Sequence, residues 1–151
     1  MTYFGIDIGK YGAIVGTTAE KDPTWIFSEI PYQDGSLAIT RLYFLLSKTI
    51  KRSDIVFLEQ QFVNQKTIWQ QGVFEGVLTS LGLTYHLIHP RKWQNVLGLD
   101  KSKESHIAYV QALGYSFTAT NKQLKHGIAD AICVALAGKT LLTRANSHTV
   151  P

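Results

Sequence analysis

The sequence predicts an α/β fold, a mixed five-stranded sheet with helices on both faces, and three observations support it. Short β-rich segments at 2–9, 13–18 and 25–30 predict three consecutive strands. Apolar runs at 55–60 and 85–88 predict two more. The helical patterns lie between and after these runs. This order of elements is typical of a sheet covered by helices.

The strand segments end at recognisable breaks. Lys10-Tyr11-Gly12 separates the first two segments, which are therefore expected to form a hairpin. Residues 55–60 (IVFLEQ) are almost continuously apolar, as in a strand buried on both faces, although Glu59 is charged. His89-Pro90 ends the last strand.

Apolar residues at helical spacing predict four helices. Ser36 is a candidate N-cap for the first and Ser102 for the third, which Gly114 ends. The expected helices span about 36–50, 72–81, 103–113 and 127–142.

Length and composition favour one domain. The chain has 151 residues, of which 45% are hydrophobic, enough to bury a core around one sheet. We expect a single domain at 1–142 and a flexible tail at 143–151. Cys133 is the one cysteine, which excludes an intramolecular disulfide and a multi-thiolate zinc site.

The opening residues lack the pattern of a signal peptide, and no apolar run approaches the ~18 residues that span a bilayer. We therefore expect a cytoplasmic protein without membrane contact. The net charge is +4 and the pI about 9.2. If three acids gather at one site, the rest of the surface is more basic still, which suits a protein that grips a phosphate backbone.

Three acids lie in apolar surroundings that folding alone would not favour: Asp7, Glu59 and Asp130. Burying an unpaired carboxylate costs several kcal/mol, and convergence on divalent cations would offset that cost. Oxygen ligands favour Mg²⁺, with Mn²⁺ as a substitute. Each acid also has a simpler interpretation: Asp7 accepts backbone hydrogen bonds, Glu59 marks where a strand surfaces, and Asp130 pairs with a lysine such as Lys125.

His126 precedes Asp130 by four residues, so the two share a helix face. It is a candidate to protonate a leaving oxygen, position water or bind metal. The alternative is a solvent-facing histidine at the helix entry.

The ordered motifs Gly5-Ile6-Asp7-Ile8-Gly9, Glu59-Gln60-Gln61-Phe62 and Ala129-Asp130-Ala131 resemble those of the RuvC family of Holliday junction resolvases. The stretch 89–101, which contains HPRKWQ, resembles phage-type members. Together the resemblance spans nearly the whole chain.

The resemblance implies an RNase H-like fold, a homodimer and Mg²⁺-dependent symmetrical nicking of a four-way junction that leaves 5′-phosphate ends. Asp7, Glu59 and Asp130 match the acidic positions of the family, which would hold two ions roughly 4 Å apart. The family's fourth group lies three residues before the last aspartate, where this chain has Gly127. Either His126 takes that role or the site works with three acids.

Several residues are candidates to bind branched DNA. Phe62 aligns with the family's base-stacking aromatic, in a stretch at 62–69 expected to form a loop. Trp69 is expected to pack under the helix that follows. The candidate phosphate contacts are Lys66, Arg91, Lys92, Lys101 and Lys103.

The helix at 72–81 has enough apolar positions for a core face and a dimer contact. Two other functions remain open. An actin-like nucleotide-binding protein shares Asp7-Ile8-Gly9 but needs further phosphate loops, and a DNA-junction binder without catalysis would keep the surface and lack a productive metal site.

Overall fold

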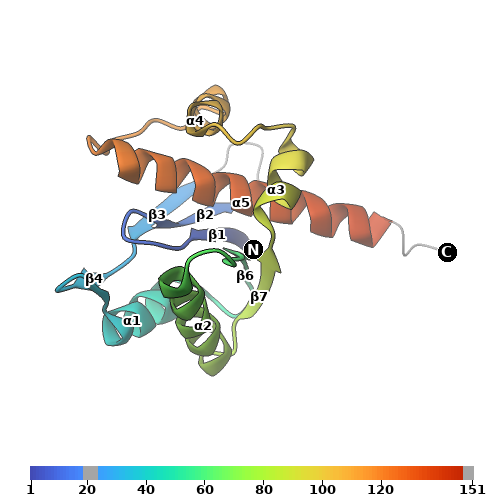
Figure 1. Ribbon diagram of the computed structural model, residues 1–151. Coiled ribbons are helices and arrows are strands. Elements are labelled where there is room, and N and C mark those ends of the chain that lie inside the picture. Colours follow the sequence, from blue (N-terminus) through green and yellow to red (C-terminus); the bar gives the residue numbers. More distant parts are fainter. Residues whose placement is uncertain (19–23, 148–151) are drawn as a thin grey trace.

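The computed structural model describes residues 1–18 and 24–147 (Figure 1). A five-stranded sheet in the order β3-β2-β1-β6-β7 forms its centre. The strands are β1 (Thr2–Asp7), β2 (Ala13–Thr18), β3 (Trp25–Glu29), β6 (Ile55–Glu59) and β7 (Thr84–Ile88). β2 pairs antiparallel with β1 and β3, whereas β1, β6 and β7 run parallel. The predicted mixed five-stranded α/β sheet is confirmed.

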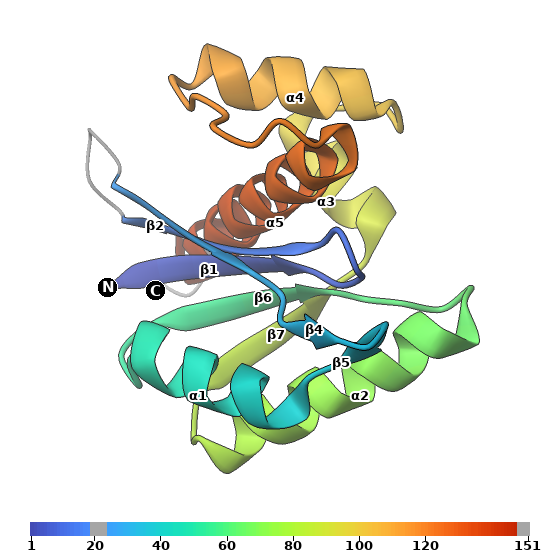
Figure 2. The same cartoon turned by 90° about the vertical axis from the view of Figure 1, so that its left-hand side faces the viewer.

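Helices cover both faces of the sheet, as the two views show (Figures 1 and 2). One face carries α1 (Ile39–Thr49) and α2 (Gln65–Ser80), and the other carries α3 (Pro90–Leu97), α4 (Lys103–Ala112) and α5 (Lys122–Ser147). α5 lies directly against β1, β2 and β6, and α3 and α4 pack on α5. The strands β4 (Tyr32–Gln33) and β5 (Ser36–Leu37) form a separate small hairpin.

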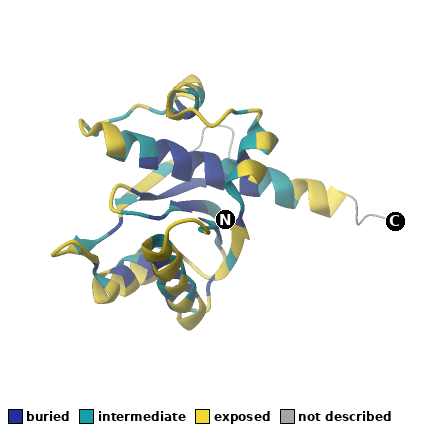
Figure 3. Cartoon of the chain, in the orientation of Figure 1, coloured by how far each residue is buried: buried dark blue, intermediate teal, exposed yellow. Residues whose placement is uncertain are grey.

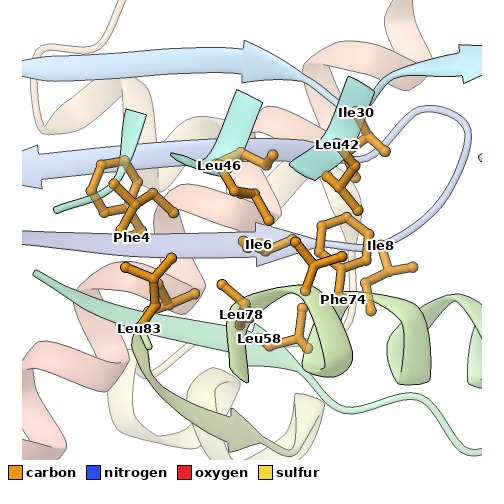
Figure 4. Close-up of a cluster of buried hydrophobic side chains, with 14 of the residues drawn as sticks. Phe4, Ile6, Ile8, Ile30, Leu42, Leu46, Leu58, Phe74, Leu78 and Leu83 are labelled. Carbon is orange, nitrogen blue, oxygen red and sulfur yellow. The ribbon is translucent and has the colours of Figure 1, made fainter. Parts of the chain in front are cut away.

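Side chains of β1 alternate between the two cores. Phe4, Ile6 and Ile8 belong to the core under α1 and α2, where Figure 4 shows them with residues such as Leu58 and Phe74. Gly5, on the opposite face, lies so close to α5 that an added Cβ would stand 1.9 Å from the backbone oxygen of Ala131. β1 therefore touches α5 through its backbone.

The middle of α5 is the most buried helical segment of the second face (Figure 3). Alanines and glycines there allow close packing: an added Cβ at Gly127 would stand 1.9 Å from the backbone oxygen of Tyr11, and one at Gly138 would stand 2.2 Å from the Phe57 ring. The helix extends past the predicted 127–142 at both ends. Residues 143–147, part of the segment expected to be a flexible tail, continue the helix, and 148–151 lie outside the described residues.

Two further helix starts, those of α1 and α2, differ from the sequence-based expectation. Ser36 does not cap α1, because it pairs with Gln33 across a turn that contains Asp34 at φ 51°. α1 begins at Ile39 instead. α2 begins at Gln65, since the side chain of Asn64 accepts hydrogen bonds from two backbone N–H groups of the first turn.

α3 was not predicted at all. His89 and Pro90, interpreted as the end of a strand, also begin a helix: Pro90 occupies the first turn, and the His89 ring accepts a hydrogen bond from the backbone N–H of Arg91. The capped start at Ser102 is confirmed, since its side chain accepts from the Ser105 N–H. That cap fixes where Lys103 begins α4.

Gly5→Ala should destabilise the protein by about 1–3 kcal/mol, because the new methyl group forces α5 away from β1. Ser47→Ala is the control: Ser47 is exposed on α1, away from this contact, and alanine there should stabilise by up to about 0.5 kcal/mol through helix propensity. Thermal unfolding of the two variants should move in opposite directions. Equal melting temperatures would contradict the close approach of α5.

Candidate active site

β1 and β6 place Asp7 and Glu59 beside each other. Ile6 pairs with Leu58 in the parallel register, so the next residue of each strand lies at the same edge of the sheet. Ile6 and Leu58 belong to the core under α1 and α2. Because side chains alternate along a strand, Asp7 and Glu59 both face α5.

α5 carries Asp130 to the same place. Its neighbour Ala131 is the residue whose backbone meets Gly5, two positions before Asp7. Asp130 is buried, with 3% of its surface exposed. Burial raises the pKa of Asp7 well above its usual value, and the charges of Glu59 and Asp130 raise it further. Three carboxylates distant in sequence are thus within electrostatic reach of one another.

Glu59 shows the same conflict between burial and charge. Burial raises the pKa of Glu59, and the charge of Asp130 adds to that effect. A hydrogen bond opposes it: the indole Nε1 of Trp93 donates to Glu59 Oε2 at 2.7 Å. Gln61 Nε2 donates a longer one, of 3.4 Å, to Oε1. Glu59 is therefore held in one orientation although its charge is disfavoured.

Lys103 supplies a positive charge to this group. Its Nζ donates to Asp130 Oδ2, and its charge lowers the pKa of Asp7 and Glu59. Burial opposes the charge on Lys103, but Asp130, Asp7 and Glu59 together raise its pKa above the usual value. The simpler interpretation of Asp130, pairing with a lysine, is confirmed, but the lysine is Lys103 rather than Lys125, and His106 contacts the other carboxylate oxygen. Lys103, a candidate phosphate contact, thus lies among the three carboxylates.

Buried side chains of α3 and α4 contact two of the acids: Trp93 contacts Glu59, and His106 contacts Asp130. His106 Nδ1 lies 2.7 Å from Asp130 Oδ1, and His106 Nε2 lies 2.8 Å from the backbone oxygen of Asp100. A carbonyl oxygen only accepts, so Nε2 carries a proton. Burial lowers the pKa of His106, but the hydrogen bonds to Asp130 and to the Asp100 backbone, together with the charge of Asp130, outweigh it, so the pKa is raised. The rings of Trp93 and His106 meet edge to face at 4.9 Å.

His126 lies near the site but does not bind Asp130. It lines an open cavity of about 240 Å³ together with Asp7 and Lys103. Its Nε2 is buried and, within the described residues, has no hydrogen-bond partner. The neighbouring Gly127 abuts the Tyr11 backbone, which explains why no side chain can occupy that position. Either the site works with three acids, or a fourth group comes from another position, and His126 lines the same cavity as Asp7.

The donor set fits a hard divalent cation in chemistry and in charge. All three converging groups are carboxylates, and the cationic ammonium of Lys103 stands among them. Across residues 1–18 and 24–147, however, no three His, Cys, Asp or Glu side chains already stand in metal-ligand geometry. Binding a cation therefore requires the side chains to rearrange.

The DNA-contact candidates fall into separate groups. Phe62, 52% exposed, stacks on His89 with ring centroids 4.8 Å apart at 12°. Both line an open cavity of about 410 Å³ with Arg91 and Lys101. Lys92 lines a different cavity, beside Phe57.

The two remaining candidates lie at the start of α2. Lys66 is on its first turn, with Nζ 3.4 Å from the backbone oxygen of Gly35. The expectation that Trp69 packs under the following helix is wrong: Trp69 belongs to α2 itself and is 56% exposed. Residues 65–69 are helical rather than a loop, so Phe62 and Val63 are the exposed apolar residues of the connection before it.

Trp93 and His106 were missed as supports of the site. Lys103 and His106 are three residues apart at the start of a capped helix, so they share a face. That spacing was a usable signal. The contact of His106 with Asp130 was not visible in the sequence, because it joins two helices.

In the described part of the chain, no helix is both long and apolar enough to cross a membrane. No model of a known protein family matches the sequence, and comparison with curated proteins gave no match.

Solved structures share the fold. Thermus thermophilus RuvC in complex with a Holliday junction substrate has a TM-score of 0.70 at 17% identity, covering 95% of this chain and 96% of that one. Another Thermus thermophilus RuvC structure has a TM-score of 0.68 at 18% identity, covering 96% and 97%. The fowlpox virus resolvase with its substrate Holliday junction DNA gives 0.53 at 11% identity, covering 91% and 98%. The expected RNase H-like fold is confirmed.

Asp7→Asn should raise the melting temperature of the metal-free protein at pH 7.5. The raised pKa means that folded Asp7 holds its proton more tightly than unfolded Asp7, so its charge costs stability as the pH rises through the folded pKa. The gain should be at least about 2 °C, the shift that about 1 kcal/mol gives in a chain of this size, and it should shrink toward pH 4.5. Thermal unfolding in EDTA measures it.

Asp34→Asn is the control for this measurement, since it makes the same chemical change on an exposed turn residue and should leave the melting temperature nearly unchanged at both pH values. A lower melting temperature for Asp7→Asn at pH 7.5 would show that the Asp7 charge is already compensated.

Proposed function

We propose that this protein is a Mg²⁺-dependent endonuclease that cuts Holliday junctions and other branched DNA by two-metal phosphodiester hydrolysis. The observation that supports this proposal most directly is that Asp7, Glu59 and Asp130 lie together on the α5 side of the sheet. The pKa values of Asp7 and Glu59 are raised there. The solved structures of Thermus thermophilus RuvC and fowlpox resolvase with Holliday junctions support the choice of substrate.

In this proposal, Asp7, Glu59 and Asp130 hold the metal. Mg²⁺ bound there would supply the charge that activates a water and stabilises the leaving 3′ oxygen. The hydrogen bond from Trp93 orients Glu59, and the contact with His106 orients Asp130. His126, whose Nε2 has no partner in the described structure and which shares a cavity with Asp7, would accept or donate a proton at the reacting water or leaving group.

The surface beside the site suits DNA whose bases are partly unstacked. The Phe62–His89 pair offers an exposed aromatic platform, and stacking one base on such a ring contributes roughly 1–3 kcal/mol. Arg91 and Lys101 line the same cavity and would bind phosphates. Lys66 would extend this basic surface at the start of α2.

Symmetrical cutting of two strands needs two sites, so we infer a homodimer related by a twofold axis. The outward face of α2 is the candidate contact. Gly72 and Gly76 are exposed there, and an added Cβ at either meets nothing within 4 Å. These glycines leave room for a helix of a second copy.

A second candidate function is junction binding without catalysis. The observation that favours it is the engagement of Asp130 by both Lys103 and His106, which leaves no preformed metal geometry among the described residues. The two functions differ in one measurable outcome, cleavage of a synthetic four-way junction in Mg²⁺.

Asp7→Asn should reduce cleavage of that junction by more than about 100-fold, because a carboxylate that holds the metal is lost. Junction affinity in Ca²⁺ should stay close to that of the wild type. Labelled strands on denaturing gels measure cutting, and direct religation of the nicks tests for 5′-phosphates. Asp34→Asn should cut normally. An inactive wild type would favour the binding function, and an Asp7→Asn variant that cuts at the wild-type rate would remove Asp7 from the mechanism.

Arg91→Glu should weaken junction binding and flatten its salt dependence. Each lost phosphate contact lowers the slope of log affinity against log salt by about 1. Arg41→Glu makes the same charge change on exposed α1, on the opposite side of the sheet, and should keep the wild-type slope. Fluorescence anisotropy between 50 and 200 mM salt, the range over which such contacts are lost, measures both. Equal slopes for the two variants would exclude the Arg91 surface.

A further inference from the structure

Lys103 and a bound metal would compete for the same oxygen of Asp130. His106 occupies Oδ1 and is itself anchored to the Asp100 carbonyl, so both ring nitrogens of this buried residue are engaged. Lys103 occupies Oδ2. A cation that uses Asp130 without breaking the buried His106 contact must therefore take Oδ2.

Lys103 is the partner that can leave. Its side chain is 49% exposed, whereas that of His106 is 1% exposed. Lysine carries a compact charge on a flexible four-carbon stem, so it can turn toward solvent or another anion from a fixed backbone. Its backbone is fixed here by the Ser102 cap at the start of α4.

The charge of Lys103 acts on the whole site. Within the described residues, it is the lysine whose charge is felt by Asp7, Glu59 and Asp130 together. While it remains, a metal must overcome both the repulsion of this ammonium and the loss of its contact with Asp130.

From this geometry we propose that Lys103 is the resident counter-ion of the catalytic site, which a divalent cation displaces and which then binds a phosphate of the DNA. The inference rests on the proposed nuclease function and deepens it. In free protein Lys103 weakens metal binding. In the DNA complex a phosphate receives the ammonium, so metal and DNA each strengthen the binding of the other.

The test is a titration of the DNA-free protein with Mn²⁺, followed by calorimetry and by the electron paramagnetic resonance signal of free Mn²⁺. Lys103→Met should bind Mn²⁺ at least about fivefold more tightly than the wild type. Lys101→Met is the matched control: it removes the same charge from an exposed residue two positions away and should change the affinity little. Binding by Lys103→Met that is no tighter than that of the wild type, or an equal gain in Lys101→Met, would overturn the proposal.

A second measurement separates competition from a general charge effect. Asp130→Asn removes the carboxylate that Lys103 and the metal share, so adding Lys103→Met to that variant should tighten Mn²⁺ binding less than it does in the wild-type background, because only the repulsion by the ammonium is then relieved. A gain as large as in the wild-type background would contradict a shared oxygen. If Lys103→Met does not fold without metal, Lys103→Gln keeps a hydrogen-bond donor to Asp130 without the charge and should also bind Mn²⁺ more tightly than the wild type.

The proposed coupling between metal binding and DNA binding can be measured separately. A junction with uncleavable linkages at the exchange point should tighten Mn²⁺ binding to the wild type, and it should do so less for Lys103→Met. Equal tightening in both proteins would refute the transfer of Lys103 to phosphate.

Failure of this inference can be told apart from failure of the nuclease function. A wild type that binds Mn²⁺ and cuts junctions, with Lys103→Met no tighter, refutes only the role of Lys103. A wild type that neither binds Mn²⁺ nor cuts refutes both.

Discussion

The close approach of α5 to β1 is the constraint on which the site depends. Glycines at the contact let the helix backbone reach the sheet backbone, with Gly5 against Ala131 and Gly127 against the turn after β1. This close packing brings an acid on the helix within electrostatic reach of acids at the ends of two strands. The same contact buries Asp130 and desolvates Asp7 and Glu59 in part, which raises the cost of their charges. The contact between α5 and β1 therefore both assembles the three acids and makes their negative charges unfavourable.

The lack of compensation for these charges distinguishes the site from an ordinary buried acid. Asp54 is also buried, but its two oxygens accept backbone N–H bonds from Thr2 and Lys51 at 2.8 and 2.9 Å. Asp7, in contrast, accepts no hydrogen bond within the described structure and faces two other acids. Burial satisfied by the backbone stabilises a fold, whereas burial left uncompensated lowers its stability and favours a cation.

The sequence predicted the sheet and all three acids because both depend on local patterns: apolar runs reveal strands, and a carboxylate inside such a run is conspicuous. It predicted the partners of those acids less well. His126 shares a helix face with Asp130 and was the natural candidate, yet His106 makes the contact, because α4 folds back onto α5. The start of α2 was missed for a related reason: the Asn64 cap fixes it, while an exposed Trp69 gives the first turns no clear apolar face.

The glycine at position 127 also limits how the chain can change. A protein that gains a fourth carboxylate one turn before Asp130 must first make room by moving the backbone of Tyr11, and that turn directly follows the strand that carries Asp7. A single substitution at 127 would thus disturb the acid it was meant to assist. A fourth acid at this position therefore requires a different conformation of the β1–β2 hairpin. Ancestors or engineered descendants with a four-acid site should differ in the loop between β1 and β2 as well.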